Sequence, residues 1–252
     1  MIDTLRSEWI KLRTVRMNRV LVIIAIAFPL VITVLTALLI DSDEMNARDL
    51  IGLVTGTSVI TGMLLGVIGA SGITGEFGFN TIRPTFAATP KRSRVLVAKA
   101  ILTVFVGIAV QTAMVALCYG LGSTILNGRG GDVAWSDAGN ARSALVGIIC
   151  FAGIVSLLGF GLGMLIRSTP AAVAVLVLWP LVAEGLIGVM LGVAGVDEPF
   201  KWLPYNAGLN LGNPDAGQTS ESLGQVAGGL YFLVVTCVVC AVGAWSTMTR
   251  DA

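Results

Sequence analysis

The sequence contains no histidine and few charged residues. Lys and Arg number 16 and Asp and Glu number 15, so 12% of the 252 residues are charged, against about 25% in an average soluble protein. The missing histidine excludes His-based catalytic triads, His-ligated metal sites and His proton relays. A mean hydropathy of +0.88 leaves too little polar surface for a water-soluble globule, which indicates a membrane protein.

Several sequence motifs are also missing. No G-x-x-x-x-G-K-[ST] P-loop is present, so ATP-driven transport would need an ATPase on another polypeptide. The glycines of 159–163 are not a dinucleotide fingerprint, because no strand precedes them. The net charge of +1 and the scattered basic residues speak against nucleic-acid binding. The cysteines all lie in apolar runs and are predicted to be small core residues. They are Cys118, Cys150, Cys237 and Cys240.

Long apolar windows dominate the rest of the chain. Each is long enough for one helix to cross the membrane, which needs about 20 mostly apolar residues, and lipid excludes open strands. The first window exceeds the roughly 7–15 residues of a signal-peptide core, so it is predicted to be a retained span. The sequence therefore predicts an all-α membrane protein with one transmembrane domain of six helices. The windows are 20–40, 50–75, 100–128, 143–166, 168–196 and 222–249.

The distribution of charge predicts the orientation. Basic residues favour the cytoplasmic side of short loops and helix ends. With both termini in the cytoplasm, 12 of the 16 basic residues lie inside and 10 of the 15 acids lie in outer loops. The sequence therefore predicts a multi-pass protein of the cytoplasmic membrane with both termini inside.

Residues 1–19 are too polar for lipid. Apolar residues recur there at helical spacing, which predicts an amphipathic helix on the inner membrane surface. The alternative is a charged flank that only fixes topology. The residues assigned to this helix are Leu5, Glu8, Trp9, Lys11, Leu12 and Arg13.

The inner loop over residues 76–99 is charged and too long for a turn. It is predicted to be a docking surface for a soluble partner, although its charge could again serve only topology. The residues assigned to this coupling region are Glu76, Thr81, Arg83, Pro90, Arg92 and Arg94.

Three other connections carry signals. In the outer loop 197–221, Trp202, Pro204 and Tyr205 predict an interfacial or re-entrant element. The glycine-rich loop 128–142 is predicted to have no regular structure. Arg167-Ser-Thr-Pro170 predicts a tight turn, with Thr169 as the N-cap of the next helix.

Glu184 is the ionisable residue deep in a span. A central acid costs about 2.5–3.5 kcal/mol on insertion scales, so Glu184 is expected to face the bundle interior or a cavity. Pro180 frees a carbonyl four residues earlier and can bend this helix. With Gln111, these residues are candidates for a transport pathway; the alternative is a structural glutamate near the outer surface.

The chain resembles the membrane subunits of bacterial ATP-binding-cassette (ABC) exporters of the type 2 permease class, the fold also called type V. Three stretches carry the resemblance. Residues 8–13, EWIKLR, are similar to the connecting helix of that family. Residues 76–83, EFGFNTIR, followed by 90–94, PKRSR, and by Lys99, are similar to its cytoplasmic coupling region. Residues 201–204, KWLP, are similar to its extracellular segment.

The resemblance implies a permease subunit without catalytic activity of its own. Two permeases, identical or similar, would each receive one P-loop ATPase subunit, which would bind ATP and Mg²⁺. The expected cargo of such an exporter is hydrophobic or amphipathic, such as a drug, a lipid or a peptide. The alternative function is an ion-gradient-driven secondary transporter, although no internal repeat is evident. A membrane-embedded enzyme is disfavoured because histidine and paired membrane carboxylates are missing.

Overall fold

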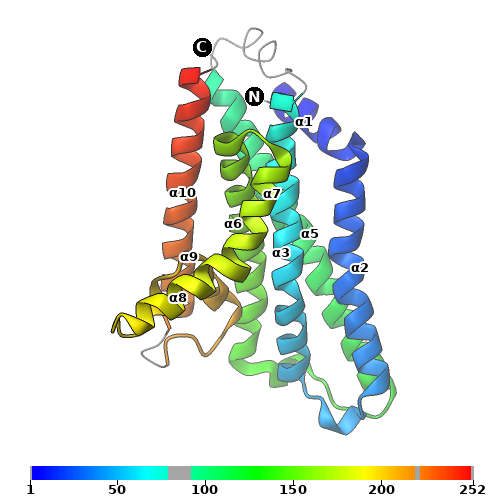
Figure 1. Ribbon diagram of the computed structural model, residues 1–252. Helices are drawn as coiled ribbons and strands as arrows, with labels where there is room; N and C mark the ends of the chain where they lie inside the picture. Colours follow the sequence, from blue (N-terminus) through cyan, green and yellow to red (C-terminus); the bar gives the residue numbers. More distant parts are fainter. Residues whose placement is uncertain (1, 79–91, 219–221, 251–252) are drawn as a thin grey trace.

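The computed structural model describes residues 2–78, 92–218 and 222–250 and contains no strand in that part of the chain. Its helices form one bundle with both termini at the same end, here called the terminal end; the opposite end is the distal end (Figure 1). Six helical segments are long and apolar enough to cross a membrane, which confirms the predicted fold class. They are α2 (Arg16–Leu39), α3 (Ala47–Gly78), α5 (Arg92–Gly128), α6 (Arg142–Ile166), the segment from α7 to α8 (Thr169–Val193) and α10 (Gln225–Arg250).

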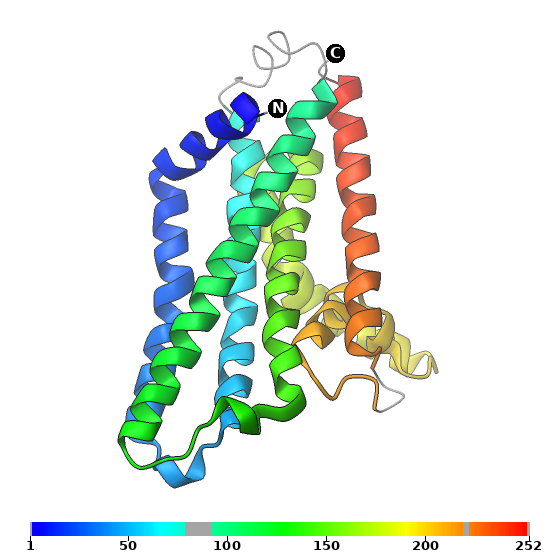
Figure 2. The same cartoon turned by 180° about the vertical axis from the view of Figure 1, so that it is seen from behind.

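At the terminal end, α2, α3 and α5 extend beyond the apolar windows predicted for them. α1 (Ile2–Thr14) is separated from α2 by Val15 alone and bends sharply away from it across the end of the bundle (Figure 2). Residues 16–19 therefore belong to the first long helix and not to the predicted interfacial helix. Likewise, the outer parts of the predicted coupling region 76–99 are the last turn of α3 and the first turns of α5.

α6 has the largest buried share of the six candidate spans and lies against α3, α5 and α10. Glycine permits its close contact with α3, because a Cβ on Gly159 would lie only 1.9 Å from the carbonyl oxygen of Gly66. These residues come from two of the small-xxx-small pairs in the sequence, which allow helix backbones to approach closely.

A proline in α2 is matched by a hydroxyl on α3. Pro29 has no N–H, so the carbonyl of Ala25 lacks its usual helical donor. The Thr61 hydroxyl of α3 donates to that carbonyl at 2.9 Å. A backbone group that lipid could not satisfy is thereby paired between two helices.

The α6–α7 connection is as tight as predicted, but its cap differs. Arg167 adopts a left-handed conformation with φ of 59°, and Ser168 is the N-cap of α7 (Thr169–Leu178). Thr169 is instead the first helical residue, and its hydroxyl lies 2.6 Å from the Thr74 hydroxyl of α3. The predicted cap was wrong because the helix starts one residue earlier.

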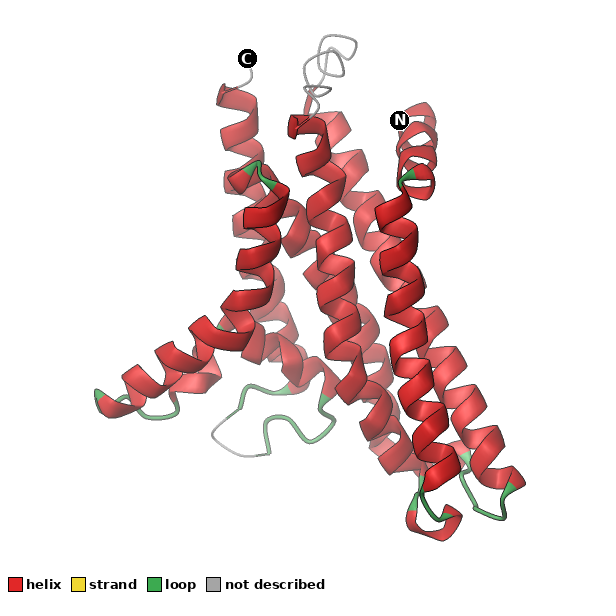
Figure 3. Cartoon of the chain, turned by 45° about the vertical axis from the view of Figure 1, so that its right-hand side comes forward, coloured by secondary structure: helices red, strands yellow, loops and turns green. Residues whose placement is uncertain are grey.

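The segment after α7 changes its winding. A π-helix, η3 (Trp179–Ala183), joins α7 to α8 (Glu184–Val193). Such a bulge, with Pro180 inside it, bends a helix. α8 accordingly points away from the bundle at the distal end (Figure 3).

Short helices make up the connections at the distal end. The loop predicted to lack regular structure contains a 3-10 helix, η2 (Trp135–Ala141). Trp135 explains the difference, because its ring packs edge-on against Tyr119 at 5.0 Å and lies under Arg142 at 5.3 Å. The other short helices are η1 (Ser42–Glu44), η4 (Pro199–Trp202), α9 (Pro204–Leu209) and η5 (Asn210–Gly212).

Candidate functional site

Four charged residues from three helices meet at the terminal end of the bundle. Glu8 and Lys11 come from α1, Glu76 from α3 and Lys99 from α5, and together they are called the ion-pair cluster. Lys99 Nζ donates to Glu76 Oε1 at 2.7 Å and also pairs with Glu8 Oε2. Lys11 Nζ lies 2.9 Å from both Glu8 Oε1 and Glu76 Oε1. Each lysine thus bridges both carboxylates.

Three of the four residues are buried. The exposed fractions are 6% for Glu8, 8% for Glu76 and 5% for Lys99, whereas the Lys11 side chain is 51% exposed. Removing one member of a buried ion pair leaves an uncompensated charge and costs about 3–5 kcal/mol. The cluster therefore fixes α1 to α3 and α5 as long as all of its members are present.

The pKa values of the two α1 residues follow from this arrangement. Burial raises the pKa of Glu8, but Lys99 and Lys11 outweigh burial and hold the pKa of this carboxyl below its usual 4.5. Burial lowers the pKa of Lys11, but its bonds to Glu8 and Glu76 outweigh burial and raise its pKa above 10.5. Both groups are therefore charged across the neutral pH range.

Helical spacing and a buried amide position α1. Glu8, Lys11 and Leu12 are three and four residues apart and share one face. At the start of α2, Asn18 Nδ2 donates to the Leu12 carbonyl at 3.4 Å, and the Ser71 hydroxyl of α3 donates to Asn18 Oδ1 at 3.2 Å. The α1–α2 corner is thereby tied to α3 by neutral hydrogen bonds as well as by charge.

The terminal end of α3 also contacts the α6–α7 turn and the start of α7. Thr74 pairs with Thr169 at the start of α7. The guanidinium of Arg167, in the α6–α7 turn, lies 5.0 Å from the centre of the Phe77 ring, a cation–π contact. The last turns of α3 therefore join α1, α5 and the α6–α7 turn immediately before the stretch 79–91.

A cavity of about 530 Å³ lies beside the ion-pair cluster. Glu8, Glu76 and Lys99 form part of its wall, whereas Leu102 and Phe160 contribute apolar surface. The cavity lining is therefore mostly apolar, with a smaller polar part at the ion-pair cluster, whose charges cancel.

The structure separates the residues predicted for α1 and the coupling region into several groups. Glu8, Lys11 and Glu76 meet in the ion-pair cluster, and Leu12 packs half-buried beside α3. Trp9, Arg13 and Arg94 are exposed and take no part in the cluster. Thr81, Arg83 and Pro90 lie outside the described residues, as do the side chains of Leu5 and Arg92.

Lys99 belongs to the cluster, although the sequence analysis named it only as a residue of the stretch that resembles the coupling region and did not assign it to the site. The available signal was that Glu76 and Lys99 are opposite charges at the two ends of one connection between apolar windows.

Glu184 is fully buried at the distal side of the π-helix. Its Oε1 accepts from Trp179 Nε1 at 3.0 Å and from the Tyr205 backbone N–H at 2.7 Å. Its Oε2 accepts from the backbone N–H and the side-chain amide of Asn206, both at 2.9 Å. Four donors thus hold the carboxylate at the N-terminus of α9, which is a favourable place for negative charge.

The other two pathway candidates occupy different environments. Pro180 lies in the π-helix and lines an apolar cavity of about 250 Å³ together with Glu184 and Phe232. Gln111 is fully buried in α5, and its amide atoms have no hydrogen-bond partner among the described residues. Gln111 does not line this apolar cavity, nor the cavity beside the ion-pair cluster, so the three candidates do not form one site.

Comparison with known proteins gives one match. A family model described as "ABC-2 family transporter protein" matches residues 4–195, which is more than half of the chain and includes the whole ion-pair cluster. No curated protein and no solved structure shows a significant match.

Proposed function

The chain belongs to the ABC-2 family of transporter proteins, and from that premise we propose that it is the membrane-spanning permease subunit of an ABC exporter. Members of this family are membrane components of transporters and are not themselves catalytic. ATP hydrolysis, with Mg²⁺, would take place on a separate P-loop ATPase subunit, present in two copies. A second permease, identical or similar, would complete the pathway.

The observation that carries this proposal is the ion-pair cluster. Glu76 and Lys99 lie at the two ends of the coupling region 76–99 implied by the resemblance, on either side of the stretch 79–91. Because both residues also bind α1, a force applied by the ATPase at that stretch would move α1, α3 and α5 together. Packed elements of this kind shift between discrete arrangements and do not deform continuously. Such a shift is the basis of the alternating access that we propose.

Charge supports placing the terminal end in the cytoplasm. Ten described basic residues lie at or near the terminal end of the bundle, against four at the distal end. Arginine and lysine near helix ends favour the cytoplasmic side. The ten are Arg6, Lys11, Arg13, Arg16, Arg19, Arg92, Arg94, Lys99, Arg167 and Arg250, and the four are Arg48, Arg129, Arg142 and Lys201.

The cavity at the terminal end supports an amphipathic cargo. Its volume of about 530 Å³ is within the usual range of small-molecule sites, about 300–1,000 Å³. Its lining combines the ion-pair cluster, whose charges cancel, with a larger apolar surface. Such a lining suits a molecule with one polar and one apolar end, such as an amphipathic drug, a lipid or a hydrophobic peptide.

The surroundings of Glu184 weaken the ion-gradient alternative. A carboxylate that couples transport to protons must exchange its proton during the cycle, and such groups face the pathway. Glu184 instead accepts four hydrogen bonds from Trp179, Tyr205 and Asn206. Its contacts are those of a structural anchor for α9.

The experiment is co-expression with candidate P-loop ATPase subunits from the same genome, followed by purification and transport in inverted membrane vesicles. We expect the ATPase to co-purify and ATP to drive uptake of a fluorescent amphipathic dye. Glu76→Ala should lower uptake at least tenfold without loss of membrane insertion, and Arg83→Ala should do the same. Glu44→Ala, an acid at the distal end, is the matched control.

Two results would contradict the proposal at different levels. If no P-loop ATPase binds and ATP does not drive uptake, the chain is not an ABC permease subunit. If the ATPase binds but Glu76→Ala and Arg83→Ala transport normally, the coupling role of this region is wrong.

A further inference from the structure

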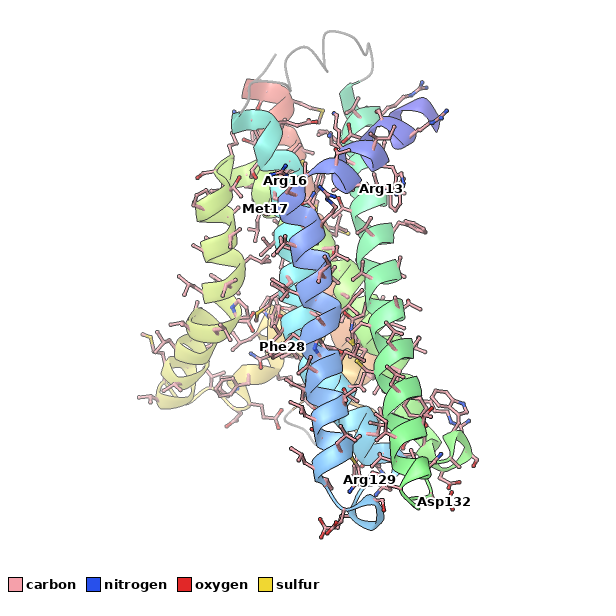
Figure 4. The ribbon with its side chains drawn as sticks, turned by 90° about the vertical axis from the view of Figure 1, so that its right-hand side faces the viewer. Arg13, Arg16, Met17, Phe28, Arg129 and Asp132 are labelled. Atoms are coloured by element: carbon pink, nitrogen blue, oxygen red, sulfur yellow. The ribbon has the colours of Figure 1, made fainter. Side chains whose placement is uncertain are left out.

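The outer side of the α1–α2 corner holds an open groove of about 430 Å³. Trp9, Ile10 and Arg13 of α1 form one wall together with Thr14, and Arg19 of α2 completes the lining. This face of α1 is opposite to the face that enters the ion-pair cluster. Figure 4 shows Arg13 together with Arg16 at this corner of the bundle.

The arginines of this corner have no anionic partner in the described part of the chain. Arg13, Arg16 and Arg19 are exposed and form no ion pair with a described residue. The nearest acid in sequence, Glu8, is bound by Lys99 and Lys11. Two arginines, Arg13 and Arg19, thus line the groove, Arg16 lies between them in sequence, and no described acid forms an ion pair with any of the three.

An apolar strip continues from the groove along α2. Arg19 and Ile23 are four residues apart and therefore lie on one face, and Val20, Ile23 and Ile24 are exposed by 53%, 64% and 45%. Side chains on a helix lean toward its N-terminus, so the Arg19 guanidinium extends toward α1 and away from this strip. Positive charge above exposed apolar surface matches the order of headgroup and acyl chain in a lipid.

We propose that this groove binds the phosphate headgroup of an anionic phospholipid, with Arg13 and Arg19 as its ligands and one acyl chain along Val20 and Ile23. The planar guanidinium fork suits phosphate oxygens and can donate two parallel hydrogen bonds. Basic pockets at the cytoplasmic surface are typical sites for anionic headgroups. Trp9 in the wall fits the enrichment of tryptophan at headgroup depth.

A bound lipid would give α1 a second attachment. One face of the helix is held by the ion-pair cluster on α3 and α5, and the opposite face would be held by the leaflet. The inference goes beyond the proposed function because lipid binding does not require an ATPase. It also does not depend on the orientation of the chain when the lipid is present in both leaflets.

The test uses the full chain in nanodiscs of phosphatidylcholine alone or of phosphatidylcholine with phosphatidylglycerol at a ratio of about 7:3. The readouts are the phosphatidylglycerol retained in native mass spectrometry and the thermal midpoint of unfolding. We expect phosphatidylglycerol to be retained and to raise the midpoint of the wild-type chain. Each arginine that donates charge-assisted hydrogen bonds to the phosphate is worth about tenfold in binding, so the Arg13→Gln/Arg19→Gln variant should bind phosphatidylglycerol about 100-fold more weakly.

Control variants separate a site from bulk attraction. Arg6→Gln/Arg94→Gln removes the same charge outside the groove and should bind like the wild type. Arg13→Lys/Arg19→Lys keeps the charge without the fork and should fall between the wild type and the glutamine variant. If the Arg13→Gln/Arg19→Gln variant folds poorly, the lysine variant alone tests whether the guanidinium groups are needed.

Three outcomes would overturn the proposal. If both glutamine variants bound phosphatidylglycerol equally well, binding would depend on the total surface charge and not on the groove. Equal stabilisation by inorganic phosphate in phosphatidylcholine discs would show a general anion site and not a lipid site. Absence of any phosphatidylglycerol effect on the wild-type chain would leave no site at all.

Discussion

Lys99 Nζ of α5 lies 2.7 Å from Glu76 Oε1 of α3, and the 13-residue stretch 79–91 lies between the two helices. This ion pair joins both sides of that stretch at the terminal end of the bundle. Lys99 also binds Glu8, so the same ammonium group fixes α1. It is therefore the member of the ion-pair cluster whose removal should have the largest effect.

We expect Lys99→Met to loosen α1. The change leaves two carboxylates with only the half-exposed Lys11, and breaking a buried pair costs about 3 kcal/mol. Tryptic cleavage after Arg13 or Arg16 should become about 100-fold faster, at 1.36 kcal/mol per factor of ten. Lys11→Met is the matched control, because an exposed pair contributes about 1 kcal/mol or less. Equal cleavage of both variants would contradict the bridging role of Lys99.

Glu184→Gln should destabilise the distal end. The amide nitrogen cannot accept the hydrogen bonds that one carboxylate oxygen now receives, and each hydrogen bond to a charged group contributes about 1.5–3 kcal/mol. We expect a lower thermal midpoint in detergent and faster thiol labelling of a cysteine placed at the partly buried Leu209 in α9. Glu44→Gln, at the same end, should change neither. Lost transport with unchanged stability would instead assign Glu184 to the pathway.

Thr61→Val should destabilise the α2–α3 contact by about 1 kcal/mol, the usual range for a hydrogen bond within a membrane bundle. Its isosteric side chain leaves the Ala25 carbonyl without a donor. Pro29→Ala restores that donor, so Thr61→Val should cost less in the Pro29→Ala background. Thermal unfolding of the four-member mutant cycle measures this difference. The control is Thr57→Val, since the Thr57 hydroxyl bonds only within α3. Full additivity would refute the link to Pro29.

The attachment of α1 should depend on pH only at the extremes. Glu8 has a lowered pKa, so its contribution is complete above about 4.5 and is lost as the pH falls through the folded-state value. Lys11 has a raised pKa, so its contribution is complete below about 10.5 and is lost as the pH rises through its folded-state value. Hydrogen exchange of α1 amides, corrected for intrinsic rates, should show constant protection between these limits. A step near pH 7 would disagree with the cluster.

Accessibility of engineered cysteines tests the orientation. We expect an impermeant maleimide to label Asp132→Cys in intact cells, and to label Arg94→Cys only after permeabilisation. The reason is the excess of basic residues at the terminal end. Cys150 and Cys237 must first be replaced by serine, because both are exposed in the chain. The reverse labelling pattern would place the ion-pair cluster outside the cell.

Composition and run length were enough to predict the number and type of the membrane helices. Apolar windows of about 20 residues allow hardly any structure except a helix in lipid. The apolar windows could not give the helix ends, because the last residues of α3 (76–78) and the first residues of α5 (92–99) are helical without being mostly apolar. The helix η2 was missed because its Trp135 contacts residues of two other helices, Tyr119 of α5 and Arg142 of α6. Such contacts between elements are not visible in a hydropathy pattern.

The partners of charged residues were beyond sequence reasoning. Glu184 was predicted to be buried, but three of its four donors come from a short helix about 20 residues later, and no periodic pattern marks them. The ion-pair cluster requires α1, α3 and α5 to be neighbours, which hydropathy does not encode.

The length of α3 determines when the ion-pair cluster can form. At 1.5 Å per residue, its 32 residues span about 48 Å, and even a tilt of 40° leaves about 37 Å across a hydrocarbon layer of about 30 Å. Glu76 is two residues from the end of this helix, so it stays in the headgroup or water region during insertion. With the terminal end in the cytoplasm, as we propose, the Glu76 carboxylate does not cross the hydrocarbon layer, and Lys11 and Lys99 can bind it after the membrane helices are inserted. Substitutions in the ion-pair cluster should therefore leave membrane insertion intact, even where they abolish transport by the assembled protein.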